Sequence, residues 1–232
     1  DYYIFNGEAV AVMCDSTVTD IVIPETVTYL GTNAFRNYSD NRDVNTVGDL
    51  IIRGGTKDEN GNITINKDVF TSTRFMNVTV GGNVTHIGEG AFESSNHYFG
   101  DVIIEDSVKS IGARAFQRCS MMNSLIIPES VTYIGQGAFE GFASNNNPPR
   151  GSLQIYGGNR EGEDIVINSG VFNQSRFKDV IIGGKVTKIA DNAFSQIYEN
   201  FIGSLTINSS SVDSTGSKLE LKISRMFFLM PI

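Results

Sequence analysis

The sequence of 232 residues contains no tryptophan, two cysteines, two histidines and five prolines. No apolar run reaches the roughly 18 residues that a membrane-spanning helix needs, so we expect no membrane insertion. Positive charge is also scarce, because 18 Lys and Arg stand against 26 Asp and Glu and leave a formal charge of -8. Nucleic acids and anionic membrane surfaces bind clustered Lys and Arg, so neither is an expected partner.

The sequence also lacks the common catalytic motifs. Neither a Gly-x-Ser-x-Gly nucleophile elbow nor a His-Glu-x-x-His metal motif occurs. His97 lies in a polar segment, and His86 occupies a position that other copies of the repeat described below fill with Tyr, Ser or Lys. We interpret both histidines as surface residues. No catalytic residue, cofactor or metal site is expected, so the protein is not expected to be an enzyme.

What the sequence does contain is a repeat. A string of the form Val-x-x-Ile/Leu-Gly/Ala-x-x-Ala-Phe spans residues 27–35, 84–92, 108–116, 131–139 and 186–194. Self-similarity with a period of roughly 20–30 residues is the signature of a solenoid, in which each coil buries its apolar face only against its neighbours. We expect the phenylalanines that end these strings to share one buried core position. They are Phe35, Phe92, Phe116, Phe139 and Phe194.

Short strands should alternate with these strings. Apolar residues recur with the spacing apolar-x-x-apolar-x-apolar, and the last two members of each set alternate as in a strand with one buried face. The Val-to-Ile spacing inside the string predicts a corner or bulge, and we expect the Ala-Phe step on a short helical turn. The predicted fold is strand-rich with little helix and about eight coils. The sets are Val18/Ile21/Ile23, Val47/Leu50/Ile52, Phe75/Val78/Val80, Phe99/Val102/Ile104, Met122/Leu125/Ile127, Arg150/Leu153/Ile155, Phe177/Val180/Ile182 and Ile202/Leu205/Ile207.

Coils two and six share a departure from this pattern. In both, a Gly-Gly pair follows the strand and opens an excursion that closes at residues 63–66 and 165–168, which are 102 positions apart. The chain is therefore a duplication of a multi-coil block. The polar tips of the two excursions, residues 56–62 and 159–164, should project from the same edge of the solenoid. Four coils of spacing place them on the order of 20 Å apart.

The ends differ from the repeat, as the ends of a solenoid must. Residues 3–12 hold Asn-Gly between two alternating runs, which predicts a capping β-hairpin with a type I′ turn. We divide the chain into this hairpin at 1–17, the solenoid at 18–207, and a C-terminal cap or truncated array at 208–232. The first residues have neither the basic start nor the apolar stretch of a signal peptide, which a mature protein also lacks.

Short polar residues recur just before the strands, and two interpretations of them differ in consequence. Oxygen ligands in such a row could bind a hard cation. Alternatively, the side chains hydrogen-bond the turn backbone, which is the interpretation that we favour. The residues are Asp20, Asp49, Asp101 and Asp179, with Asn77, Ser124, Ser152 and Ser204 in the same position.

The two cysteines, Cys14 and Cys119, are expected to be free thiols. They lie about three coils apart, which at ~4.8 Å between stacked strands is ~14 Å or more. A disulfide needs Cα atoms within ~7 Å. We expect Cys119 to be a small core residue.

The middle residue of each strand should point outward, and five of the eight are aliphatic. Such a row is either a partner surface or a result of the β-propensity of branched residues, and both interpretations stay open. With the tips of the two excursions it supplies the candidate partner-binding residues. These are Val22, Ile51, Ile103, Ile126, Ile181, Lys57, Asp58, Glu59, Arg160, Glu161 and Glu163.

The run Ile127-Pro-Glu-Ser-Val-Thr-Tyr-Ile-Gly-Gln-Gly-Ala-Phe139, with Ile23-Pro-Glu-Thr-Val-Thr-Tyr-Leu30, resembles the BspA-like leucine-rich repeats of bacterial surface proteins. The Asn-Gly-Glu-Ala run at 6–9 is similar to the start of such domains, and the resemblance covers roughly residues 18–207. It implies an α/β leucine-rich-repeat solenoid in an extracellular or cell-surface location. Some members are similar to adhesins, and the family pattern carries no catalytic residue.

Two functions of different classes are compatible with these observations. The favoured hypothesis is a non-enzymatic, secreted or cell-surface recognition module, monomeric, that binds protein or glycan on a host or neighbouring cell. It would do so through the strand face and the inserted loops. The alternative is a structural spacer array within a larger surface protein, with no ligand of its own.

Overall fold

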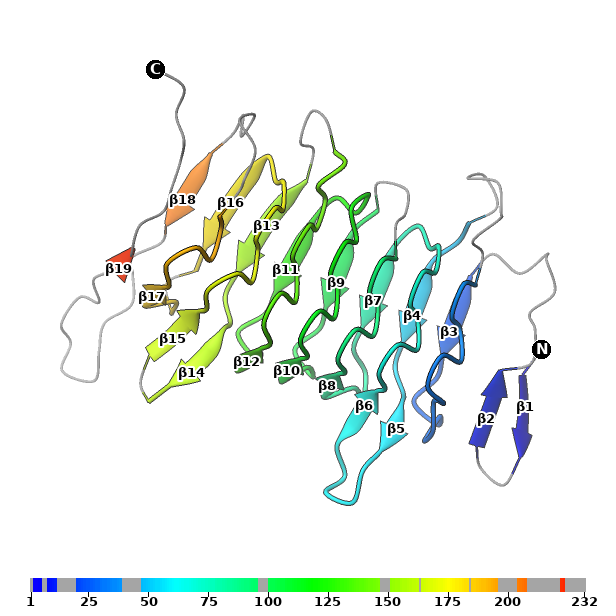
Figure 1. The fold of residues 1–232 in the computed structure, drawn as a ribbon. Helices are drawn as coiled ribbons and strands as arrows, with labels where there is room; N and C mark the ends of the chain where they lie inside the picture. Colours follow the sequence, from blue (N-terminus) through cyan, green and yellow to red (C-terminus); the bar gives the residue numbers. More distant parts are fainter. Residues whose placement is uncertain are drawn as a thin grey trace.

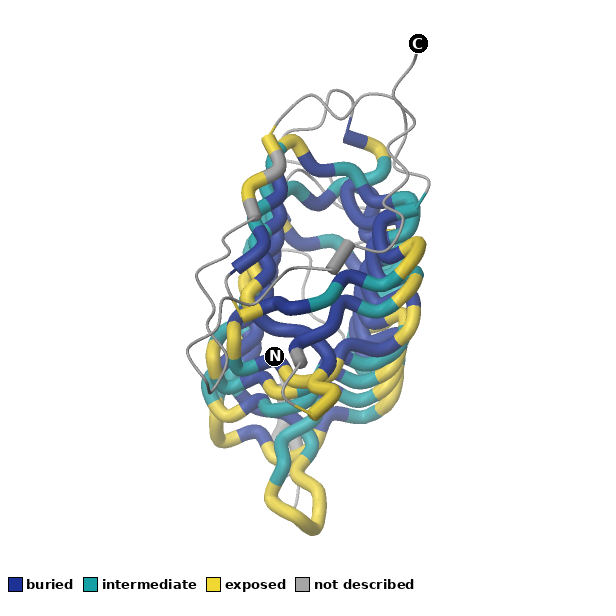
Figure 2. Tube along the Cα trace, turned by 90° about the vertical axis from the view of Figure 1, so that its left-hand side faces the viewer, coloured by how far each residue is buried: buried dark blue, intermediate teal, exposed yellow. Residues whose placement is uncertain are grey.

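The protein is a solenoid of stacked coils, as predicted (Figure 1). The computed structural model describes residues 2–5, 8–11, 20–38, 47–95, 100–146, 151–162, 164–183, 185–195, 204–207 and 222–223. No helix occurs within these ranges, so the α component of the predicted α/β class is not seen there. Buried residues line the inside of the coils, whereas exposed residues lie on the outside (Figure 2).

One long parallel sheet forms the first face of the solenoid. Its eight strands coincide with the eight predicted apolar sets. In the first seven along the chain, the alternating apolar residues are buried and pack against the neighbouring coils. The strands are β3 (Ile21–Ile23), β4 (Leu50–Ile52), β7 (Val78–Val80), β9 (Val102–Ile104), β11 (Leu125–Ile127), β13 (Ser152–Ile155), β16 (Asp179–Ile182) and β18 (Leu205–Ile207). We call this the main sheet.

The predicted corner lies just before the Val of the repeated string rather than between its Val and Ile, as shown by the Val84 N–H, which donates to the Gly81 carbonyl at 3.0 Å. In the coils of β3, β7, β9, β11 and β16, this turn follows the main-sheet strand and leads into a second face. There the chain forms short strands that also pair in parallel from coil to coil. Two antiparallel hairpins, β5–β6 and β14–β15, interrupt this series. The strands are β5 (Thr56–Lys57), β6 (Ile63–Ile65), β8 (His86–Ile87), β10 (Ser110–Ile111), β12 (Tyr133–Ile134), β14 (Asn159–Glu161), β15 (Asp164–Ile167) and β17 (Lys188–Ile189).

The third face consists of turns, and here the predicted helical turn at the Ala-Phe step is wrong. Residues two before and two after the phenylalanine have left-handed backbone conformations, so a right-handed helix cannot continue through them. In the coil of Phe116 these are Arg114 (φ 55) and Arg118 (φ 59). Alternate backbone N–H groups then donate to the next coil, as Phe116 does to the Ala138 carbonyl at 2.7 Å. The left-handed residues thus turn this face into a third inter-coil ladder.

Seven phenylalanine rings form a continuous stack behind the turns. Neighbouring rings are nearly parallel, with centroids 4.8 Å apart for Phe92–Phe116 and 5.4 Å for Phe116–Phe139. Of the five predicted members, four are buried and Phe35 is only partly buried. Phe70 and Phe172 also belong to the stack, although a Val rather than an Ala precedes them. The stack runs in the order Phe35, Phe70, Phe92, Phe116, Phe139, Phe172 and Phe194.

The predicted N-terminal hairpin is present in the backbone. Strands β1 (Tyr2–Phe5) and β2 (Glu8–Ala11) pair antiparallel, while the Asn-Gly turn between them lies outside the described residues. Near the other end, β19 (Lys222–Ile223) pairs in parallel with β17. Cys119 is a free, fully buried thiol, as predicted, and its Sγ donates to the Phe92 carbonyl at 3.2 Å. Cys14 and His97 lie outside the described residues.

Candidate recognition surfaces

The outward residues of the main sheet form one in-register row across all eight strands. Val22, Ile103 and Ile126 are 54%, 43% and 37% exposed, and Ile51 and Ile181 are half-buried. Strand pairing places each member directly beside the next one, with Thr79 and Gln154 separating the aliphatic stretches. We call this set of eight residues the outward row. It is Val22, Ile51, Thr79, Ile103, Ile126, Gln154, Ile181 and Thr206.

A ladder of short polar side chains borders the outward row. Six of these side-chain oxygens accept a hydrogen bond from the backbone N–H of the equivalent residue one coil later, as Asp101 does from Ser124 at 3.0 Å. The same contact joins Asp20 to Asp49 at 2.9 Å and Asp179 to Ser204 at 2.9 Å. The hydrogen-bonding interpretation is therefore the right one, although the acceptor serves the next coil rather than its own turn. No cluster of metal-ligating side chains occurs in the described part of the chain.

The hairpin β5–β6 carries the first of the two predicted tips. Asp58 holds that tip closed, because its carboxylate accepts from the backbone N–H groups of Asn60 at 2.9 Å and Asn62 at 2.8 Å. The Asn62 side-chain amide donates to the same carboxylate at 2.8 Å and lowers the pKa of Asp58 below its ordinary value. Lys57, Asp58 and Glu59 are all exposed. The charged side chains therefore sit on an ordered turn.

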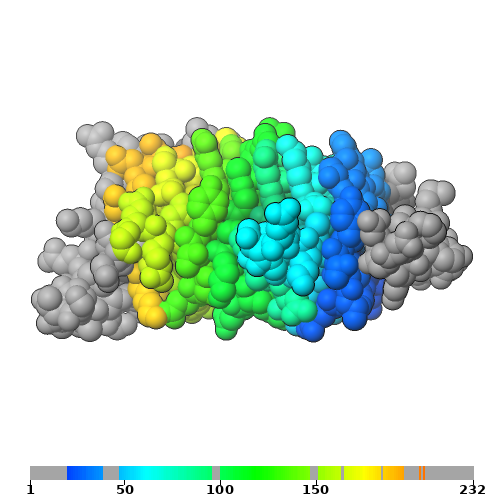
Figure 3. Space-filling view, turned by 90° about the horizontal axis from the view of Figure 1, so that it is seen from below, coloured from blue at the N-terminus to red at the C-terminus, as the bar shows by residue number. Residues whose placement is uncertain are grey.

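The hairpin β14–β15 occupies the equivalent place in the second block. Arg160 and Glu161 are exposed on β14, whereas Glu163 lies outside the described residues. Glu161 forms an ion pair with Lys188 of the next coil at 3.8 Å. Both hairpins lie along the lower edge of the solenoid in Figure 1 and on the face that Figure 3 shows. The prediction that they share one edge is thus confirmed.

Each hairpin is fastened to the coil before it by a side chain in addition to backbone hydrogen bonds. Thr56 Oγ1 accepts from the Leu30 N–H at 2.8 Å and lies 3.1 Å from the Leu30 carbonyl. In the second block the buried Asn159 does the same, accepting from the Ile134 N–H and donating to the Ile134 carbonyl at 3.1 Å. Gly54 permits this approach, because any side chain there would collide with the Pro24 carbonyl. The hairpins therefore leave the solenoid at fixed positions.

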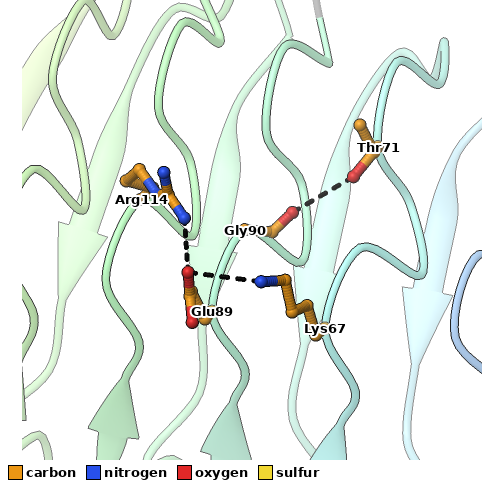
Figure 4. Close-up of polar contacts among 5 residues, drawn as sticks. All are labelled: Lys67, Thr71, Glu89, Gly90 and Arg114. Atoms are coloured by element: carbon orange, nitrogen blue, oxygen red, sulfur yellow. Dashed lines mark hydrogen bonds and ion pairs between the residues drawn. The ribbon is translucent and has the colours of Figure 1, made fainter.

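Alternating charges connect three coils on the outer surface. Glu89 pairs with Arg114 on one side and with Lys67 on the other, at 3.5 Å (Figure 4). The Arg114 guanidinium, followed by Lys67, lowers the pKa of Glu89. All three side chains are exposed to solvent, where salt screens such pairs, so this row adds little to stability.

His86 is half-buried on β8, between Thr64 and Ser110 in register, and its Nδ1 lies 2.7 Å from Thr85 Oγ1. It is therefore less exposed than predicted, because the adjacent strands flank it. Among the described residues, no helix has the length and apolar character needed to cross a bilayer.

Comparison with solved structures finds leucine-rich repeat proteins from two bacteria. The chain is 21% identical to a leucine rich cell surface protein from Faecalibacterium prausnitzii A2-165, with a TM-score of 0.52. The match covers 89% of this chain and 52% of that one, so the chain spans about half of that protein's length. A leucine-rich repeat protein from Bacteroides ovatus ATCC 8483 matches at 16% identity over 90% of this chain and 75% of its own, but its TM-score of 0.29 is too low to indicate a common fold.

No curated protein matches the chain in sequence. The family described as BspA type leucine rich repeat region matches in six copies over residues 11–52, 58–148 and 164–219. The predicted count of about eight coils is therefore slightly high in terms of regular family repeats, although the main sheet has eight strands. With most of its length matched, the chain belongs to the BspA-type leucine-rich repeat family.

Proposed function

We propose that this solenoid is a non-enzymatic recognition module, displayed on or secreted from a bacterial cell, that binds a protein or glycan through its main sheet and its two hairpins. The observation that carries this proposal is the outward row. Five aliphatic residues are held in register on a rigid sheet, three of them more than a third exposed. Exposed apolar surface gathered on one face, as at the adjacent Ile103 and Ile126, marks interaction sites more often than ordinary surface does.

The polar ladder supports the same assignment. Because the Asp, Asn and Ser side chains beside the outward row already bind backbone N–H groups, they fix the strand spacing. A partner that approaches the sheet therefore meets a preformed surface and loses little binding free energy to ordering it. The cell-surface protein from Faecalibacterium prausnitzii shares this fold, which is compatible with display at a surface.

The experiment is a binding screen of the purified chain against matrix proteins and glycans, repeated with the double variant Ile103→Thr/Ile126→Thr. Threonine occurs naturally in the outward row at Thr79, so the variant preserves the strand. Loss of two central apolar contacts should weaken binding by about tenfold or more. Met76→Thr is the matched control, because Met76 is an exposed apolar residue, 38% exposed, that does not belong to the row.

The spacer hypothesis makes the opposite prediction. A chain that binds nothing in the screen, or a double variant whose affinity equals that of the wild type, would contradict recognition through the main sheet. A loss of affinity that Met76→Thr reproduces would show a general effect of apolar surface rather than a site.

A further inference from the structure

Tyrosine occupies the outward position of the second face in the two coils that immediately precede a hairpin. Tyr29 is 42% exposed and Tyr133 is 54% exposed. In other described coils the same position holds His86, Ser110 or Lys188. Buried aromatic residues serve the core, but these two rings have no such role. Both tyrosines lie in the first coil of their block. The same position in the third coil differs between the blocks, with His86 in the first block and Lys188 in the second.

Each exposed tyrosine adjoins a cation from the first strand of the hairpin. The Lys57 N–H donates to the carbonyl of Thr28, the residue before Tyr29, at 3.0 Å. In the second block the Arg160 N–H donates to the carbonyl of Thr132 at 3.1 Å, one residue before Tyr133. Lys57 and Arg160 are both exposed. We call these the two Tyr–cation pairs, Tyr29/Lys57 and Tyr133/Arg160.

Carboxylates outnumber cations around both pairs. Asp58 and Glu59 follow Lys57 directly, and the lowered pKa of Asp58 keeps its carboxylate ionised. Glu161 follows Arg160 and also pairs with Lys188. An anionic ligand would be repelled by this excess of carboxylates. A cationic ligand would be repelled by Lys57 or Arg160 beside each ring. A neutral ligand with many hydroxyl groups is compatible with both pairs.

We propose that the two Tyr–cation pairs are subsites for a neutral polysaccharide, an inference that rests on the proposed recognition function and assigns a ligand class to the hairpin edge. The C–H face of a sugar ring packs on a tyrosine ring, which presents a flat apolar surface with few rotatable bonds. The neighbouring Lys or Arg donates hydrogen bonds to the sugar hydroxyls. The pairs lie on the order of 20 Å apart, so one chain of sugars spans both and gains from bivalence.

The test measures binding of soluble β-glucan, α-mannan and galactan to the wild type, to Tyr29→Ser, to Tyr133→Ser and to the double variant. Serine is the residue at the same position in the coil of Ser110, so the fold tolerates it. Because the chain has no tryptophan, its intrinsic fluorescence comes from eight tyrosines, and the difference between the wild type and each variant isolates the contribution of Tyr29 or Tyr133. Tyr156→Ser is the matched control. Tyr156 is a third exposed tyrosine, but its hydroxyl bonds Gln154 on the main-sheet side.

We expect at least one polysaccharide to bind the wild type and the control alike. Each single variant should lose the bivalent gain, a weakening on the order of 100-fold, and the double variant should not bind. Absence of binding by the wild type, or a double variant that binds as the wild type does, overturns the subsites. The outward-row variant Ile103→Thr/Ile126→Thr separates the two proposals. If it alone loses a protein partner while the polysaccharides never bind, recognition stands and the glycan subsites fail.

Discussion

The ring of Phe116 lies parallel to that of Phe92, with 3° between the planes and 4.8 Å between the centroids. Both side chains are 1% exposed. Each coil of a solenoid is stabilised only by contacts with its two neighbours. A ring that packs against the rings of both neighbouring coils therefore contributes to two inter-coil interfaces. Removal of one central ring should therefore leave a cavity that the adjacent coils cannot fill.

Substitution Phe116→Ala should lower the free energy of unfolding by about 3–5 kcal/mol, because it removes a fully buried ring between two others. Phe35→Ala should cost clearly less, since Phe35 is only partly buried at the end of the described stack. Chemical denaturation of both variants measures the difference. Equal losses, or an unchanged midpoint for Phe116→Ala, would show that the stack does not carry the core.

The polar ladder can be tested at one rung. Asp101→Ala removes the acceptor of the Ser124 N–H and should destabilise the chain by about 1 kcal/mol. Asp101→Asn should retain most of the stability, because Asn77 makes the same contact with Asp101 at 2.9 Å. Amide exchange at Ser124 should rise in the Ala variant only. Equal exchange in both variants would refute the assigned bond.

The left-handed turns predict a position-specific effect at Gly170, whose φ is 73°. A Cβ there meets nothing within 4 Å, so the cost of Gly170→Ala comes from the backbone conformation alone. We expect a loss of about 1–2 kcal/mol. Gly170→Asn should cost less, since Asn192 holds the same conformation one coil later. Thermal unfolding of the two variants checks the order, and an Ala variant as stable as the Asn variant would contradict it.

Three carboxylates make stability depend on pH in the acidic range. Asn62, Arg114 and the Ser204 N–H respectively lower the pKa values of Asp58, Glu89 and Asp179. A lowered folded-state pKa contributes stability that is fully present above the unfolded value of about 4 and is lost as pH falls through the folded value. The melting temperature should thus be level near neutral pH and fall below about pH 4.

Glu89→Gln provides the control for this pH dependence. It should reduce the fall in melting temperature, because the neutral amide no longer titrates beside Arg114. A melting temperature that rises on acidification, or a Gln variant with the same slope as the wild type, would contradict the assigned cause.

The strands of the main sheet could be predicted directly from the sequence. Apolar residues two positions apart, such as Leu125 and Ile127, indicate a strand with one buried face. The turns could not. A non-glycine residue such as Arg114 or Asn33 gives no local signal for a left-handed conformation, which the neighbouring coils impose through their hydrogen bonds. Phe70 was missed for a simpler reason, since a Val replaces the Ala of the repeat before it.

The candidate surfaces divide in the same way. The outward row followed from strand alternation, and its exposure agrees with that pattern at Val22, Ile103 and Ile126. The Tyr–cation pairs could not be predicted, because Lys57 and Tyr29 come from different coils. Only the stacking of β5 on the preceding coil, through the bond from the Lys57 N–H to the Thr28 carbonyl, brings these segments together. The signal present in the sequence was the recurrence of Tyr before both Gly-Gly excursions.

Recognition through the main sheet is tested most directly by isoleucine-methyl NMR of the chain with the tightest protein partner from the binding screen. Each central strand offers an internal comparison, since Ile103 and Ile126 point outward while Ile104 and Ile127 are buried beside them. We predict that the partner shifts or broadens the methyl signals of Ile103 and Ile126 and leaves those of Ile104 and Ile127 nearly unchanged. Unperturbed outward methyls in a saturated complex would contradict recognition through the main sheet.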